Sequence, residues 1–144
     1  YLFAGKIALK NHEPEQAKQY LQEAIALDPE YMEAILVLMS IYSKEESYDE
    51  IISLYEHISA QDFDWTALYP FVAEAYDKEE EFDKAYEMYR AAYEDFKEDP
   101  AFLEKYCYFL LEDGKQEQAK EIAAQLVALD PTEQQYIELL ERFE

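Results

Sequence analysis

Apolar residues recur every three to four positions along nearly the whole chain, which is the period that places side chains on one face of an α-helix. Short polar runs interrupt this pattern at residues 11–13, 44–47, 78–81 and 113–115. No segment alternates β-branched and polar residues as a half-buried strand does. The pattern therefore predicts an all-α protein in which each polar run joins two amphipathic helices.

The helical pattern itself repeats with a period of 34 residues. One series of positions holds Ala17, Ile51, Ala85 and Ala119, and another holds Gly5, Met39, Ala73 and Cys107. Small residues at fixed places of a repeat allow two helices to cross closely, so each period predicts one antiparallel helix pair. Because Met39 and Ile51 are large, we expect the second pair to pack more openly or with shifted helices.

The repeat divides the chain into four helix pairs and one final helix. We expect the pairs at about residues 1–31, 32–63, 64–99 and 100–133 of a single array, and a capping helix over 134–144. The chain has no initiator Met and opens within a helical pattern, so we expect a piece of a longer protein.

Two positions in the third pair change the expected helix ends. Pro70 would break a helix interior, so we expect that helix to begin near Thr66, with Asp64 and Thr66 as competing caps. Pro100 lies three residues beyond Lys97, which is the place of the period that Pro29 holds in the first pair. We therefore expect the second helix of the third pair to extend to Phe96.

The charge balance limits the classes of partner. Lys and Arg number 12 against 34 Asp and Glu, which gives a formal net charge of −22. Nucleic acid and anionic membranes both need basic residues, so neither is expected as a partner. The acidic surface indicates either high solubility or a cationic partner. A single cysteine and no long apolar run favour a cytoplasmic location.

Candidate chemistry is sparse. His12 and His57 have no metal-ligand spacing and are expected to be solvated, while Cys107 lies in the small-residue series and is expected in the core. The acidic run at residues 77–83 lacks the glycine of a calcium loop. We expect no cofactor, no metal and no enzymatic activity.

Taken together, the repeat resembles the tetratricopeptide repeat (TPR) family. The resemblance covers nearly the whole chain and is carried by the 34-residue period together with Tyr1, Tyr69, Gly5, Ala73, Ala85, Tyr89, Ala92, Pro29 and Pro131. It implies a right-handed superhelix of antiparallel helix pairs, whose inner surface is lined by the first helix of each pair. Ile51, Ile58 and Phe63 depart from the family pattern.

The resemblance also implies which residues line the inner groove. They are Leu2, Phe3, Lys6, Leu36, Val37, Ser40, Lys44, Phe71, Glu74, Lys105 and Tyr108. The apolar N-terminal half would hold an apolar peptide or an amphipathic helix, unless the coil is tight enough to bury it. Some members of the family hold the acidic tails of heat-shock chaperones with Lys, Asn and Arg side chains on the inner face. At the matching places of this chain only Lys6 could serve, so we expect no such clamp.

The leading hypothesis is therefore an adaptor or scaffold that binds a protein or peptide partner in this groove. One alternative is a peptide-sensing regulatory domain of a larger protein. Another is a structural array that self-associates, for example as a homodimer, through the helix at residues 1–8. The acidic, tyrosine-rich composition is similar to that of cytosolic TPR proteins of Gram-positive bacteria.

Overall fold

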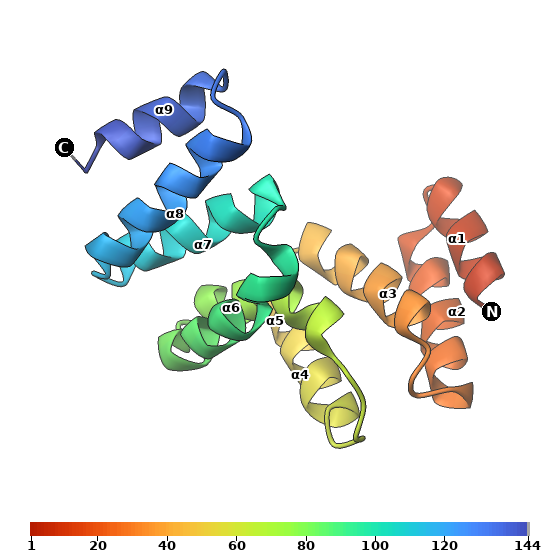
Figure 1. Ribbon diagram of the computed structural model, residues 1–144. Helices are drawn as coiled ribbons and strands as arrows, with labels where there is room; N and C mark the ends of the chain where they lie inside the picture. Colours follow the sequence, from red (N-terminus) through yellow and green to blue (C-terminus); the bar gives the residue numbers. More distant parts are fainter. Residues whose placement is uncertain (144) are drawn as a thin grey trace.

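The computed structural model describes residues 1–143, which form helices and no strand (Figure 1). The helices are α1 (Leu2–Lys10), α2 (Pro14–Leu27), α3 (Met32–Lys44), α4 (Tyr48–Ile58), the 3-10 helix η1 (Thr66–Leu68), α5 (Tyr69–Lys78), α6 (Phe82–Phe96), α7 (Pro100–Glu112), α8 (Gln116–Leu129) and α9 (Gln134–Glu141). The all-α prediction is confirmed. The expected last helix ends at Glu141, and Glu144 lies outside the described residues.

Consecutive helices pack in pairs along the array. The pairs are α1 with α2, α3 with α4, α5 with α6 and α7 with α8, and α9 packs against α8 at the C-terminal end (Figure 1). The first helices of neighbouring pairs also approach each other, α3 beside α5 and α5 beside α7. No helix formed by residues 1–143 is long and apolar enough to cross a membrane.

The four turns within the pairs share one backbone geometry. Each has a positive φ at the same place of the 34-residue period, at His12 (63°), Glu46 (57°), Glu80 (62°) and Gly114 (80°). The next residue donates its backbone N–H to a carbonyl five positions earlier, as the N–H of Lys115 does to the oxygen of Leu110 at 2.9 Å. This arrangement satisfies the last carbonyls of the first helix, so each turn stops one helix and starts the next.

The crossing within each pair depends on the two 34-residue series, all of whose positions are buried. A Cβ atom on Gly5 would lie 3.0 Å from Cγ of Leu21, and the Sγ of Cys107 donates to the Ala119 carbonyl at 3.3 Å. These contacts show how closely small residues let the helices approach. The prediction of a more open second pair is confirmed, because α3 and α4 pack less closely than the other three pairs.

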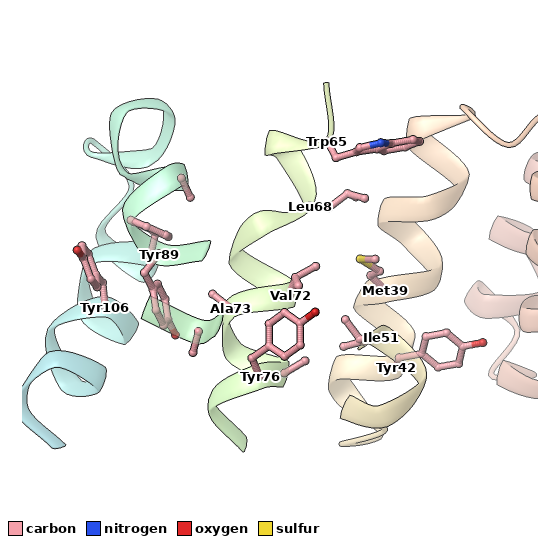
Figure 2. Close-up of a cluster of buried hydrophobic side chains, with 14 of the residues drawn as sticks. Met39, Tyr42, Ile51, Trp65, Leu68, Val72, Ala73, Tyr76, Tyr89 and Tyr106 are labelled. Atoms are coloured by element: carbon pink, nitrogen blue, oxygen red, sulfur yellow. The ribbon is translucent and has the colours of Figure 1, made fainter. Parts of the chain in front are cut away.

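Aromatic side chains fill the space between the third and fourth pairs. The buried ring of Tyr89 on α6 stacks on Tyr106 of α7, with centroids 5.1 Å apart (Figure 2). The centroid of the Phe109 ring also lies 5.1 Å from that of Tyr89. Phe102 completes the cluster at 5.8 Å from Tyr89. Because these rings are large, the backbones of α6 and α7 stay well apart while their side chains remain in contact.

The start of the third pair agrees with the reasoning about Pro70. Asp64 accepts a hydrogen bond from the Thr66 N–H at 3.1 Å, and η1 then leads into α5, with Pro70 in the first turn of α5. Thr66 is therefore the first residue of the 3-10 helix, and the regular α-helix begins at Tyr69. The prediction that the second helix of this pair reaches Phe96 is confirmed.

Candidate functional site

The first helices of the pairs present a surface that we call the A-helix face. It comprises the solvent-accessible residues of α1, α3, α5 and α7. Side-chain bonds join each of these helices to the next. Lys6 on α1 pairs with Glu33 on α3. Ser43 on α3 donates to Glu74 on α5 at 3.2 Å, and Lys105 on α7 pairs with the same carboxylate at 2.7 Å. These links connect the four helices along the face.

In the N-terminal half of the A-helix face, most of the predicted apolar groove residues are only partly accessible. Phe3 is 77% exposed. The remaining ones pack against the core with part of their surface open, namely Leu2, Leu36, Val37 and Phe71. A partner would therefore find one exposed ring and a shallow apolar surface here.

Two polar residues of this half differ in their availability. Ser40 donates its hydroxyl to the carbonyl of Val37 in its own helix at 2.7 Å, which uses its donor locally. Lys44 is exposed in the last turn of α3, where its charge also complements the helix C-terminus. Lys44 is therefore the polar group in this part of the face that remains open to a partner.

Three other predicted residues converge in a hollow between α5 and α7. Glu74, Lys105 and Tyr108 line it, and its volume is about 350 Å³. The family resemblance also implies Glu112 on this face, whereas sequence reasoning did not place the other lining residues there: Asp77, Lys78, Tyr89, Ala101, Glu104 and Phe109. Several of these follow from helical spacing, since Asp77 and Lys78 lie three and four residues after Glu74. Tyr89 belongs to α6 and could be placed here only by the fold.

The electrostatics of this hollow, which we call the α5/α7 groove, are dominated by carboxylates. Burial raises the pKa of Asp77, and the neighbouring charges of Glu112 and Glu74 raise it further, against a smaller opposing effect of Lys78. Burial also raises the pKa of the Tyr89 hydroxyl, with Asp77 as the next cause. Both shifts mean that the ionised groups are costly in this groove, which would be relieved by a positive charge.

A second hollow, of about 450 Å³, lies between α2, α3 and α4. Its walls are more apolar and include Ile25, Leu38, Tyr42, Leu54 and Ile58. His57 also lines it and is exposed, as expected. No sequence motif indicates this hollow, because it arises from the spacing between α2 and α4.

The remaining candidates for chemistry occupy structural positions. Cys107 is buried, and burial raises its thiol pKa to about 11, so the thiolate that nucleophilic chemistry needs is disfavoured. His12 is exposed at the positive-φ position of the first turn. Within residues 1–143 there is no group of three potential ligands from His, Cys, Asp and Glu that could hold a metal ion.

Comparison with family models and a curated protein gives consistent matches. A tetratricopeptide repeat model matches residues 8–74, and a model described as YpiA-like, C-terminal tetratricopeptide repeats matches residues 68–133. The chain is 36% identical over 144 residues to the TPR repeat-containing protein YpiA of Bacillus subtilis (strain 168). The match covers the whole chain and 34% of YpiA, so the chain spans about a third of the length of that relative.

Solved structures share the fold at low sequence identity. The crystal structure of MamA superposes with a TM-score of 0.85 at 15% identity, covering 99% of this chain and 84% of that one. YrrB, described as a TPR protein with an unusual peptide-binding site, gives a TM-score of 0.81 at 18% identity, covering 99% of this chain and 74% of that one. These likenesses concern the arrangement of helices.

Proposed function

This chain belongs to the tetratricopeptide repeat family, and on that premise we propose that it is a non-enzymatic scaffold for protein–protein interaction. In this proposal, a peptide or an amphipathic helix of a partner protein binds along the A-helix face. The observation that carries it is the α5/α7 groove, where Lys105 and the 44% exposed Tyr108 lie beside Glu74 around an open volume of about 350 Å³. That volume lies at the lower end of the range of ligand pockets.

Two further features support binding at this face. The bonds of Glu74 to Ser43 and Lys105 fix three helices relative to one another, so the surface is preorganised before a partner arrives. Exposed tyrosine is also one of the residue types enriched where partners bind tightly. YrrB, which has the same fold, is described as having a peptide-binding site, and this supports the same class of function.

We place this function in the cytoplasm. The free thiol of Cys107 is buried in the core and is compatible with a reducing compartment.

A peptide-display selection on the purified chain tests the proposal. Tyr108→Ala removes one large ring from the A-helix face without changing a buried residue. Leu129→Ala is the matched control on α8, where an apolar side chain of similar exposure is removed. Val37 and Phe71 are less suitable sites, because they pack against the core and their replacement could disturb the fold.

The expected result is enrichment of peptides that bind the parent and the α8 control equally, and bind the α7 variant about tenfold more weakly or worse. Equal affinity for all three proteins would contradict binding at the A-helix face. Circular dichroism of each variant would verify that its helices are intact.

A specific observation also favours a second candidate function, which is self-association through α1. Tyr1, Phe3 and Ile7 are 58%, 77% and 45% exposed, and they form an apolar surface on that helix. We propose that two chains pair through it. Light scattering should then give a dimer mass that Phe3→Glu/Ile7→Glu converts to a monomer mass. A concentration-independent monomer mass for the parent would contradict this candidate.

A further inference from the structure

The α5/α7 groove has a charge that its own residues do not balance. Four carboxylates line it, from Glu74, Asp77, Glu104 and Glu112, against the two lysines Lys78 and Lys105. Lys105 is already paired with Glu74, whose side chain is 14% exposed. The other three carboxylates form no ion pair within residues 1–143. An additional cation would therefore find partners in the groove.

Tyr89 supplies an independent observation at the floor of the same groove. Its side chain is 2% exposed and is held by the aromatic stack, yet it lines the open volume. The hydroxyls of Tyr76 and Tyr86 have partners in Glu56 and Gln118, whereas that of Tyr89 has none within residues 1–143. No fully buried side-chain oxygen within residues 1–143 lacks a partner, so this hydroxyl is reached from the open volume and can accept a hydrogen bond from a group that the partner supplies.

Tyr89 and the carboxylates line the same groove. The charges of Asp77, Glu74 and Glu112 all act to raise the pKa of this phenol, and all three residues line the groove. A donor that entered the groove could therefore reach the phenol oxygen and carboxylate oxygens together. Above them, the exposed ring of Tyr108 offers a face that attracts cations at the rim.

We propose that the α5/α7 groove binds the side chain of a basic residue, preferentially arginine, in an extended segment of the partner protein. This inference rests on the proposed function and specifies the chemistry of the partner. The guanidinium group donates to the Tyr89 hydroxyl oxygen and to the carboxylates of Asp77 and Glu112, while its stem lies against Tyr108. Arginine is preferred to lysine because its planar fork carries five donors for several acceptors at once.

A metal ion is not the occupant that this geometry favours. The carboxylates of residues 1–143 include no group arranged to hold one. An acidic segment is opposed by the net charge of the groove and by that of the whole chain, −22. The charge complementarity therefore favours a basic segment.

The test uses NMR titration of the whole chain with N-acetylarginine methylamide. The uncharged analogue N-acetylcitrulline methylamide has nearly the same shape and serves as the ligand control. The arginine probe is expected to shift amide signals of α5 and α7 saturably, and the citrulline probe is expected to leave them unchanged. Equal shifts by both probes, or shifts spread over the acidic surface without saturation, would overturn the proposal.

Protein variants sharpen the test. Asp77→Asn/Glu112→Gln should weaken binding of the arginine probe about tenfold, since hydrogen bonds to charged groups are lost. The matched control Glu117→Gln/Glu121→Gln removes the same charge from exposed positions of α8 and should bind as the parent does. Tyr89→Phe keeps the aromatic stack and removes only the hydroxyl, and it should weaken binding several-fold. Parent-like affinity in either groove variant would overturn the proposal.

The display selection separates this inference from the proposed function. If the enriched peptides depend on Tyr108 but contain no basic residue, the arginine site is wrong and the A-helix face still binds peptides. If arginine-containing peptides are enriched and lose affinity when arginine is replaced by citrulline, both are supported.

Discussion

The second helix pair and the third use opposite kinds of residue at the same places of the repeat. Where α3 and α4 cross, the two series place Met39 and Ile51, and these helices pack less closely than the other pairs. Where α5 and α6 cross, the same positions hold Ala73 and Ala85, and the backbones approach closely. All four side chains are fully buried, so the difference is one of helix separation and not of exposure.

The spacing between pairs changes in the opposite sense. The open second pair packs closely on the third through α4 and α5, whereas the compact third pair is kept apart from the fourth by the rings around Tyr89. Large residues therefore set where the array is wide, and small residues set where it is narrow. Hollows remain between helices of neighbouring pairs. The one between α2 and α4 is apolar, and the one between α5 and α7 is acidic.

The largest effect is expected where one ring holds two pairs together. Tyr89→Ala removes the centre of the aromatic cluster and should lower the free energy of unfolding by about 3–5 kcal/mol, as large buried rings do. Tyr55→Ala on α4 is the comparison variant, because Tyr55 packs beside Tyr69 and is only partly buried. Urea denaturation measures both. An equal loss for the two variants would contradict the special role given to the aromatic cluster.

Exchanging residue sizes at the crossings should damage both pairs, for different reasons. Met39→Ala leaves a cavity between α3 and α4 and should cost about 2–5 kcal/mol. Ala85→Leu forces α5 and α6 apart and should cost about 1–3 kcal/mol. The same urea measurement applies. If Met39→Ala were neutral, α3 and α4 could close the gap, and residue size would not set their spacing.

These crossings were accessible to sequence reasoning because each depends on a residue type at a fixed period. Ala73 and Ala85 predicted that the helices of the third pair cross closely. Met39 and Ile51 predicted a more open crossing in the second pair. The charged groups of the α5/α7 groove were only partly accessible. Glu74, Lys105 and Tyr108 followed from the family resemblance. Tyr89 belongs to α6, and the packing between the pairs decides whether it reaches the groove. Periodicity does not predict that packing.

The four turns offer a smaller and more local comparison. Gly114 adopts its positive φ without strain, and no atom lies within 4 Å of where a Cβ would be, so Gly114→Ala should cost about 1–2 kcal/mol through the backbone alone. Glu80→Gly at the equivalent place should stabilise by less than about 1 kcal/mol, because the flexible unfolded chain offsets part of the relieved strain. Thermal unfolding of both variants should show shifts of opposite sign.

The smallest expected effect is the pH dependence of Asp77. Its pKa is raised in the folded protein, so the folded state binds this proton more tightly than the unfolded state does. Ionisation of Asp77 therefore costs stability above the raised pKa, and this cost disappears as the pH falls below the unfolded value. Asp77→Asn should be more stable than the parent at neutral pH and equal to it in acid. Urea midpoints across this range would show a constant difference if the pKa were not raised.

Hydrogen exchange of the chain with and without a display-selected peptide tests the central claim most directly, since it reports which helices the partner covers. Binding along the A-helix face predicts added protection in α5 and α7, with little change in α2 and α4. Protection confined to α2 and α4 would place the partner over the apolar hollow of the first two pairs and would contradict the account.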